Sequence, residues 1–380
     1  MLIHSKLPNV GTTIFTTMSA LAREYNAINL SQGFPDFGCD AKLLDLANKY
    51  MMQGFNQYAP MQGVIQLRET IADILHVSYN ATYNPDTEIT VTAGATQGIY
   101  TSIAAFVKEG DEVIVFEPAY DCYIPAIELH GAKAIPVSLS YPGFTIPWDE
   151  VIKKVNEKTR MIIINSPHNP SGTTLTENDL KTLEILVKDK DIIVLSDEVY
   201  EHMVFDDKPH QSVARYYHLR QQSLIISSFG KTVHTTGWKI GYVAAPEYLM
   251  KEFRKVHQFL VFAVNHPFQL ALAEYLKNKD NYRELKHFYE KKRDYFRKLI
   301  GNSRFQVEPC TGTYFQLLNY TGITDEKDTD FAIRLTKEFK LASIPLSVFY
   351  TKATNEKLLR FCFAKKDETL EKAAEILVKI

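Results

Sequence analysis

Short runs of apolar residues alternate with longer amphipathic stretches between about residue 43 and residue 275. A polar residue follows each clear apolar run, and the clearest runs are 113–116, 161–164, 192–195 and 224–226. Uninterrupted apolar strands that alternate with helical stretches are typical of a mainly parallel sheet with helices on both faces. The pattern therefore predicts an α/β fold for this part of the chain.

The pattern changes beyond residue 275. A charged helix is expected at 283–299, and it leads into a region where short strands and helices are mixed. The expected strands are 305–307, 314–318 and 358–363, and the expected helices are 329–339 and 368–378. The predicted organisation is an amino-terminal segment (1–42) that packs with the small domain, a large domain (43–275) and a small α+β domain (276–380).

Two lysines follow the apolar run at 224–226. Ser228 and Lys231 lie in the sequence SSFGKT, and Lys239 comes eight residues after Lys231. A lysine forms a Schiff base with a carbonyl group, whereas serine, threonine and a second cation suit a phosphate. An aldehyde cofactor that carries a phosphate, pyridoxal phosphate, fits both requirements. Solvated surface lysines are the alternative interpretation of the same pattern.

Polar residues also follow two other apolar runs. Asp197 and Tyr200 come after the run at 192–195, and Asn169 lies in the loop after 161–164. Ligands of open parallel sheets bind at the carboxyl ends of strands, so these side chains are candidates for one site. A buried Asp197 would need a cationic partner, which a protonated pyridine nitrogen supplies. The alternatives are an ordinary core tyrosine and an asparagine that shapes a loop.

A strand expected at 88–92 leads into a turn of small residues at 93–96, and a helix is expected to begin near Gln97. Free backbone N–H groups and the positive end of such a helix attract an anion. Ala95 and Thr96 are therefore candidate phosphate ligands. An ordinary strand-to-helix turn is the alternative.

Several motifs spread along the chain resemble those of one enzyme family. They are NLSQGFPDF at 29–37, NQYAP at 56–60, GAT at 94–96, NSPHNP at 165–170, SDEVYE at 196–201, SSFGK at 227–231 and RFCF at 360–363. With these motifs the chain resembles the pyridoxal-phosphate-dependent class I and II aminotransferases of fold type I. Within that family it is most similar to the bacterial methionine aminotransferases and the kynurenine/glutamine transaminases. The resemblance implies a large lobe with a seven-stranded, mainly parallel sheet between helices, and a smaller α+β lobe formed by both chain ends.

The resemblance also implies roles for individual residues of a cofactor site. Lys231 would form the Schiff base with the cofactor, and Asp197 would pair with its pyridine nitrogen. Tyr200 and Asn169 would contact the phenolic oxygen, and Tyr120 would stack on the ring. The implied phosphate ligands are Ala95, Thr96, Ser228, Lys239 and, from the neighbouring subunit of a homodimer, Tyr58.

Further residues are implied to bind the substrate. Arg360 would hold the substrate carboxylate, because its planar fork suits a bidentate pair, and Gly33 and Asn169 would lie beside it. Phe15 and, from across the dimer, Phe262 correspond to aromatic pocket residues. A buried residue that anchors the helix expected at 16–25 is the alternative interpretation of Phe15.

These roles imply ping-pong transfer of an amino group from an amino acid to a 2-oxo acid. Lys231 would also act as a base, which requires a pKa lowered by burial and nearby positive charge. An aromatic pocket without a segment that clearly supplies a second arginine favours large neutral donors. Methionine is the first candidate, and aromatic amino acids, glutamine and kynurenine follow. A carbon–sulfur β-lyase of the same fold is the alternative function.

Composition excludes other classes of partner. The 380 residues carry a formal net charge of −2, which gives no bulk attraction to nucleic acid or to acidic membranes. No apolar run approaches the ~20 residues that a membrane helix needs, and no export signal is recognised. The four cysteines are scattered, so neither a zinc site nor a disulfide framework is expected. We therefore expect a cytoplasmic enzyme without metal, nucleic-acid or membrane partners.

Overall fold

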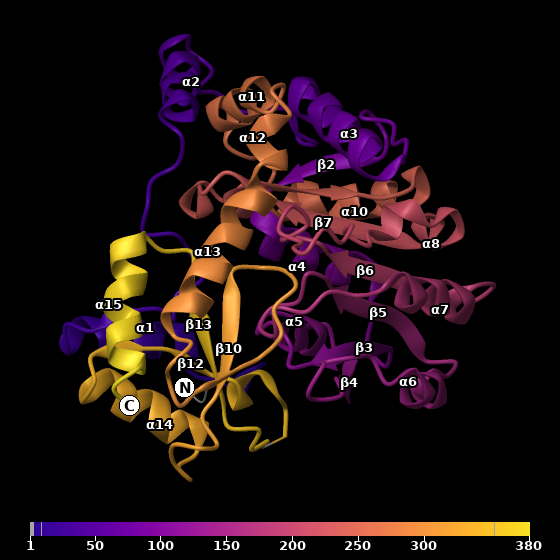
Figure 1. The fold of residues 1–380 in the computed structure, drawn as a ribbon. Helices are drawn as coiled ribbons and strands as arrows, with labels where there is room; N and C mark the ends of the chain where they lie inside the picture. Colours follow the sequence, from indigo (N-terminus) through magenta and orange to yellow (C-terminus); the bar gives the residue numbers. More distant parts are fainter. Residues whose placement is uncertain (1–3, 9, 353) are drawn as a thin grey trace.

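The computed structural model describes residues 4–8, 10–352 and 354–380 (Figure 1). The strands of its largest sheet are β2 (Ile89–Thr92), β3 (Glu112–Glu117), β4 (Lys133–Ser138), β5 (Thr159–Asn165), β6 (Ile193–Asp197), β7 (Ser223–Ser228) and β8 (Gly241–Ala244). They are ordered β2-β8-β7-β6-β5-β3-β4 across the sheet. β8 runs antiparallel to both neighbours, and the remaining pairs are parallel. The predicted mainly parallel seven-stranded sheet is confirmed.

Side chains of this sheet point alternately to its two faces. Ile162 and Ile164 of β5 lie in one buried apolar cluster, and Met161 and Ile163 lie in a second cluster on the opposite face. One face is covered by α4 (Gly94–Phe106), α5 (Tyr123–Leu129) and α10 (Glu247–Leu260), and the other by α3 (Ile65–Tyr79), α7 (Glu177–Val187) and α8 (Tyr217–Gln221). Because both faces are covered, the strands read as continuous apolar runs in the sequence.

A second, antiparallel sheet lies in the C-terminal part of the chain, shown in orange and yellow in Figure 1. Its strands are β9 (Gln306–Val307), β10 (Phe315–Asn319), β12 (Ile344–Pro345) and β13 (Leu358–Cys362), in the order β12-β13-β10-β9. The helices of this part are α12 (Asp280–Arg283), α13 (Leu285–Leu299), α14 (Asp328–Lys337) and α15 (Asp367–Leu377). α13 runs from the large sheet to the small one and packs on α15 (Figure 1).

The N-terminal part of the chain joins the C-terminal part. α1 (Ile14–Glu24) packs on α14, and β1 (Ile28–Asn29) pairs in parallel with β11 (Leu341–Ala342). The side chain of Thr13 caps α1 by accepting a hydrogen bond from the Thr16 N–H group at 3.3 Å. This pairing places the loop after β1, which contains Gly33, between the two sheets. The division of the chain at residues 42 and 275 stays a prediction.

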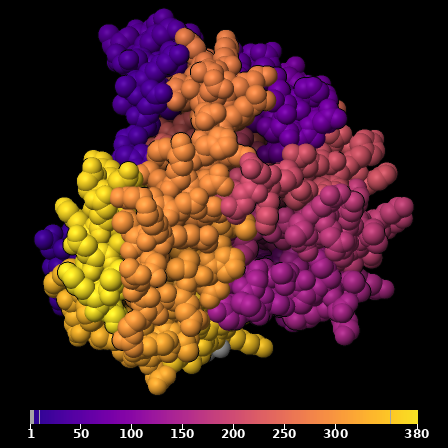
Figure 2. Space-filling view, viewed as in Figure 1, coloured from indigo at the N-terminus to yellow at the C-terminus, as the bar shows by residue number. Residues whose placement is uncertain are grey.

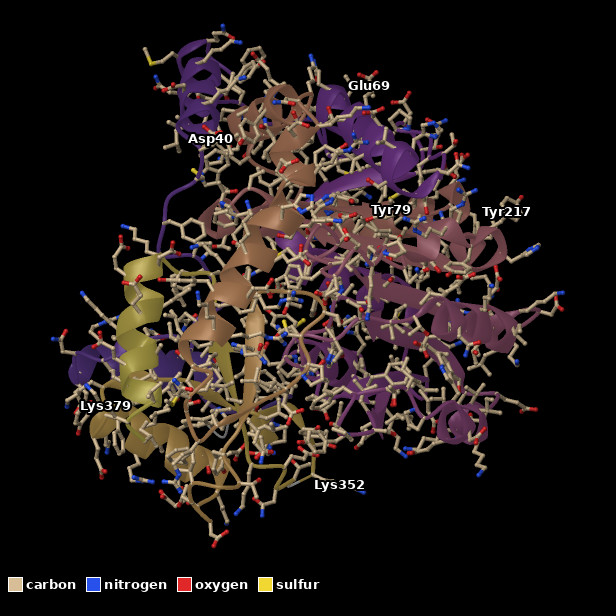
Figure 3. The ribbon with its side chains drawn as sticks, in the orientation of Figure 1. Asp40, Glu69, Tyr79, Tyr217, Lys352 and Lys379 are labelled. Carbon is tan, nitrogen blue, oxygen red and sulfur yellow. The ribbon has the colours of Figure 1, made fainter. Side chains whose placement is uncertain are left out.

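α2 (Ala41–Met52) stands at one end of the molecule and packs on α11 (His266–Tyr275) (Figures 1 and 2). Asp40, labelled in Figure 3 where the chain enters α2, accepts a hydrogen bond from the Lys42 N–H group at 2.8 Å. The Tyr275 hydroxyl donates to the second carboxylate oxygen of Asp40 at 2.9 Å. One side chain therefore both caps α2 and ties it to α11.

Three details differ from the sequence-based expectations. The helix expected near Gln97 begins at Gly94, so residues 94–96 form its first turn. The charged helix expected at 283–299 corresponds to α13, which begins at Leu285, and Arg283 belongs to the short helix α12 before it. β4, a half-exposed edge strand, and β8 were not expected. Within the described residues, no helix has the length and apolar content needed to cross a membrane.

Candidate active site

A cavity of about 320 Å³ opens where β5, β6 and β7 end. Asn165, Asp197 and Ser228, the last residues of these strands, all line it. The cavity brings together twelve of the residues singled out in the sequence: Phe15, Gly33, Ala95, Thr96, Tyr120, Asn169, Asp197, Tyr200, Ser228, Lys231, Lys239 and Arg360. Among the described residues, no group of His, Cys, Asp or Glu side chains is arranged to hold a metal ion.

Lys231 lies on α9 (Phe229–Thr232), the single turn that follows β7. Its Nζ donates hydrogen bonds to the Gly33 carbonyl oxygen at 2.9 Å and to the Tyr314 hydroxyl at 2.8 Å. Burial, with the positive charges of Arg360 and Lys239, lowers the pKa of Lys231 to about 8. A large fraction of this amine is therefore neutral near pH 8, as a nucleophile or a base requires.

Asp197 is 3% exposed at the end of β6. In the described part of the chain its oxygens accept hydrogen bonds from neutral groups, the Tyr123 hydroxyl at 2.6 Å and the Val199 N–H group at 3.3 Å. Burial raises the pKa of Asp197 to about 6, although the Tyr123 hydrogen bond opposes the shift. Such a carboxylate is stabilised by a cationic group that enters the cavity.

The first turn of α4 and the side chain of Lys239 form an anion cradle at one side of the cavity. Gly94 has a φ of +76°, and a β-carbon at that position would lie 3.3 Å from the Lys239 Nζ. Lys239 itself is held in the left-handed conformation with a φ of 55°. Backbone N–H groups in the first turn of a helix lack partners within the helix, so Ala95 and Thr96 can donate to an anion here. Ser228 adds a hydroxyl to the same cavity.

Arg360 lies on β13 and is 1% exposed. Its Nη1 donates to the Asn169 side-chain oxygen at 2.6 Å, and its Nη2 donates to the Ser31 carbonyl at 3.0 Å. Its Nε is buried and has no hydrogen-bond partner among the described residues. Burial lowers the pKa of Arg360, yet the guanidinium stays charged. A buried guanidinium whose described partners are neutral oxygens is suited to bind a carboxylate.

Aromatic rings form the apolar wall of the cavity near Arg360. The guanidinium carbon lies 3.9 Å from the centre of the Phe315 ring and 5.2 Å from that of Phe15. Phe15 also contacts Phe349 at a ring distance of 5.9 Å. Tyr120 stands against Tyr123, with ring centres 5.8 Å apart. The cavity therefore offers a charged end and an adjoining aromatic surface.

Comparison with known proteins identifies the family. The family model described as aminotransferase class I and II matches residues 25–377. The chain belongs to the class I and II aminotransferases. Transaminase activity and the fold of this family, predicted from the sequence, are confirmed by this match.

Named relatives of this aminotransferase differ in substrate. It is 48% identical over 375 residues to a methionine aminotransferase of Escherichia coli K12, which covers 98% of this chain and 97% of the relative. It is 31% identical to the human kynurenine–oxoglutarate transaminase 3, over 98% of this chain and 89% of the relative. The solved E. coli structure of YbdL, described as identifying a methionine aminotransferase function, superimposes with a TM-score of 0.98 at 47% identity over all of both chains.

Two predicted site residues of the aminotransferase do not line its cavity. Tyr58 is 81% exposed and Phe262 is 55% exposed, and their ring centres lie 5.1 Å apart on the surface. Phe262 has a φ of 67°, which is unusual for a residue other than glycine. Within one copy of the chain, these two aromatic residues contact each other and solvent.

Besides Phe315 and Phe349, sequence reasoning missed four side chains that touch the predicted residues. Tyr314 contacts Lys231, Tyr123 contacts Asp197, and the Asn165 side chain accepts a hydrogen bond from the Asn169 N–H group at 2.9 Å. Gln32 donates to the Phe15 carbonyl at 3.0 Å. Asn165 and Gln32 lie inside recognised motifs, so their positions in the sequence could have indicated that they belong to the site. Tyr314 and Tyr123 lie outside every motif, and only tertiary packing brings them to the site.

Proposed function

We propose that this aminotransferase moves the amino group of a large neutral L-amino acid, with methionine preferred, to a 2-oxo acid in a ping-pong reaction. The observation that carries the proposal is the meeting of three buried or half-buried charged groups, Lys231, Asp197 and Arg360, in one cavity. Their described contacts leave each of them able to take a further partner. The amine of Lys231 suits an aldehyde, and the carboxylate of Asp197 suits a pyridinium. The guanidinium of Arg360 suits a substrate carboxylate.

The lining residues fit pyridoxal phosphate. Asp197 would hold the protonated ring nitrogen, which relieves the cost of its buried charge. The cradle of Ala95, Thr96, Ser228 and Lys239 would hold the phosphate, and its closest approach depends on the absence of a side chain at Gly94. Tyr200 and Asn169 would hold the phenolic oxygen, and Tyr120 would cover the ring. When bound, the cofactor supplies an electron sink for the α carbon of the amino acid.

Lys231 carries two tasks in this proposal. It would attach the cofactor, and after the amino acid has taken its place it would accept the proton from the substrate α carbon and deliver it to the carbonyl carbon of the cofactor. The lowered pKa of about 8 supports the second task, because the amine is then available as a base near neutral pH. Burial is the largest cause of that lowered pKa, so the closed geometry of the site and its chemistry are linked.

Arg360 would orient the substrate by its carboxylate. Asn169, which Arg360 contacts at 2.6 Å, and the nearby Gly33 backbone would complete this end of the site. Phe15 and Phe315 would then receive an apolar or aromatic side chain. Arg360 is the one arginine among the described residues that line the cavity, which favours a neutral side chain over an acidic one. The 48% identity to a methionine aminotransferase supports methionine.

A homodimer would complete the site. Tyr58 and Phe262 lie on an exposed apolar face, which we call the α2/α10 face and define by Met52, Phe55, Tyr58, Phe259 and Phe262. Phe55 joins this face to α11 through a ring contact of 5.4 Å with His266. Large exposed apolar side chains gathered on one face are typical of interaction sites. In the dimer, Tyr58 of one subunit would reach the phosphate in the other, and Phe262 would reach the substrate pocket.

Borohydride trapping tests the assignment of Lys231. Reduction of the protein loaded with pyridoxal phosphate, followed by peptide mass analysis, is expected to place the cofactor on Lys231. Lys231→Ala should lose both the trapped cofactor and transamination. Lys239→Ala serves as the control, because it should keep trapping at Lys231 while cofactor affinity falls by about tenfold, the size of one charged contact to the phosphate. Trapping at another lysine, or full turnover by Lys231→Ala, would overturn the proposal.

A further inference from the structure

The amine of Lys231 is held by two groups from distant parts of the chain. The Gly33 carbonyl lies after β1, and Tyr314 lies just before β10, whereas Lys231 follows β7 of the large sheet. The Nζ lies 2.9 Å from the Gly33 oxygen and 2.8 Å from the Tyr314 hydroxyl. The Tyr314 hydroxyl also donates to the Gly33 oxygen, which closes a triangle of hydrogen bonds. Segments next to strands of three different sheets therefore meet at this one amine.

The direction of these hydrogen bonds follows from counting protons. Burial raises the pKa of Tyr314 well above its ordinary value, so its hydroxyl keeps its single proton. That proton goes to the Gly33 oxygen, and toward Lys231 the hydroxyl can only accept. Lys231 must donate in both contacts. A neutral amine has two N–H bonds, so both are used, and its lone pair occupies the remaining tetrahedral position.

The hydroxyl of Tyr314 contributes hydrogen bonds at Lys231, whereas the ring provides the packing contacts of this residue. The ring is 1% exposed and packs against Tyr200, Tyr289 and Phe315, contacts that a phenylalanine would also make. The Gly33 carbonyl reaches the triangle because residue 33 has no side chain, since a β-carbon there would lie 2.9 Å from the Phe315 ring. The described hydrogen bonds of the Tyr314 hydroxyl go to Gly33 and Lys231.

We propose that Tyr314 is a positioning residue for the base of the reaction. In the part of the cycle where the amino acid has replaced Lys231 on the cofactor, Tyr314 and the Gly33 carbonyl hold the freed amine by its two N–H bonds. The lone pair is then fixed toward the cavity that Lys231 lines, where it accepts the α proton. This inference rests on the proposed function, and it adds a residue outside the motifs that carry the family resemblance.

Tyr314→Phe removes the hydroxyl and keeps the ring. Tyr289→Phe is the matched control, because the Tyr289 ring touches Tyr314 with centres 5.5 Å apart, while its buried hydroxyl has no hydrogen-bond partner among the described residues.

In the cofactor-free full-length protein, the pH dependence of Lys231 labelling by fluorodinitrobenzene measures the pKa of the Lys231 amine. We expect about 8 for the unchanged protein. Tyr314→Phe should lower it by about one pH unit, since the accepted hydrogen bond stabilises the ammonium more than the amine. Tyr289→Phe should leave it unchanged.

A second measurement uses the loaded enzyme. Single-turnover reaction with methionine carrying hydrogen or deuterium at the α carbon should slow about tenfold in Tyr314→Phe, with a larger isotope effect. The dissociation constant of methionine should stay within about twofold, because Arg360 and the aromatic wall are unchanged. If the labelling pKa and the isotope effect of Tyr314→Phe both equal those of Tyr289→Phe, the proposal is wrong. If the unchanged enzyme does not react with methionine, the proposed donor is wrong, and the labelling experiment still decides the role of Tyr314.

Discussion

Asp197 and Arg360 are buried charges whose described hydrogen-bond partners are neutral. Burying a charge without a counter-charge costs several kcal/mol, and a folded chain tolerates it where a ligand supplies the partner. Asp197 responds by a pKa raised to about 6, whereas Arg360 stays charged and rests against neutral oxygens and aromatic rings. At the residue scale, a buried carboxylate and a buried guanidinium with neutral hydrogen-bond partners indicate a ligand that carries both a cationic and an anionic group.

Asp197→Asn should stabilise the cofactor-free protein at pH 7.5. A carboxyl whose pKa is about 6 in the folded chain and near 3.9 in the unfolded chain binds a proton on folding between these values. Its contribution to stability is therefore present at low pH and is lost as the pH rises through about 6. Removing the charge should raise the free energy of unfolding by about 1–3 kcal/mol at pH 7.5 and by about half as much at pH 5. Denaturant unfolding at both pH values measures this difference.

Asp206→Asn is a control for which the expected change in the free energy of unfolding has the opposite sign. Hydrogen bonds from Arg293 lower the pKa of Asp206, so its charge stabilises the fold and its removal should destabilise the protein at pH 7.5. With pyridoxal phosphate added, Asp197→Asn should gain less stability than the unchanged protein. A cofactor-free Asp197→Asn protein that is less stable at pH 7.5 would contradict the account of this carboxyl.

Individual site residues were predictable where they sit at the ends of apolar runs or inside motifs. Lys231, Asp197 and Asn169 follow buried strands, and the common edge of a parallel sheet brings them together. Tyr314 and Tyr123 have no such signal. Their hydroxyls reach Lys231 and Asp197 because separate elements pack side by side, and sequence spacing does not record that packing.

At the scale of elements, the buried strands and long helices of the large sheet were the most predictable. β5 and β6 are apolar on both faces, so their sequences stand out, whereas the edge strand β4 is half-exposed and does not. The start of α4 was misplaced by three residues, because Gly94 reads as a turn residue although it belongs to the first turn of the helix. The misplaced residues belong to the anion cradle, where Gly94 has a positive φ.

The α2/α10 face is the proposed interface of the dimer. Phe259, at the end of α10, is 88% exposed, so Phe259→Lys should weaken the proposed dimer without disturbing the fold. Sedimentation of the unchanged protein should give a dimer, and the variant should dissociate at micromolar concentration. Its cofactor affinity should fall as well, because Tyr58 of the partner subunit would be lost from the phosphate site.

Ile185→Lys on α7 is the matched control, since Ile185 is 75% exposed and lies away from the α2/α10 face. This variant should sediment like the unchanged protein and retain its cofactor. A monomeric unchanged protein that binds pyridoxal phosphate tightly would contradict the proposed interface. Equal behaviour of the two lysine variants would contradict the choice of face.

At the scale of the whole molecule, the site exists because two sheets and the N-terminal loop meet. The large sheet supplies Lys231 and Asp197, the small sheet supplies Arg360 and Phe315, and the loop after β1 supplies Gly33. Cofactor chemistry and substrate recognition are thus carried by different parts of the chain. The carboxylate site and the aromatic wall lie together on the small-sheet side, so we infer that this side selects the donor.

A donor panel in single-turnover half-reactions tests whether the enzyme transfers the amino group of large neutral amino acids. The protein loaded with pyridoxal phosphate is mixed with methionine, phenylalanine or aspartate without an acceptor, and the cofactor absorbance and the released 2-oxo acid are followed. Methionine and phenylalanine should convert the cofactor and release their 2-oxo acids, and a 2-oxo acid should restore it. Aspartate should react about a hundredfold more slowly, because a second carboxylate would be buried against the aromatic wall. Rapid conversion by aspartate with inert methionine would contradict the account, as would pyruvate and ammonia released from cystathionine while methionine yields no 2-oxo acid.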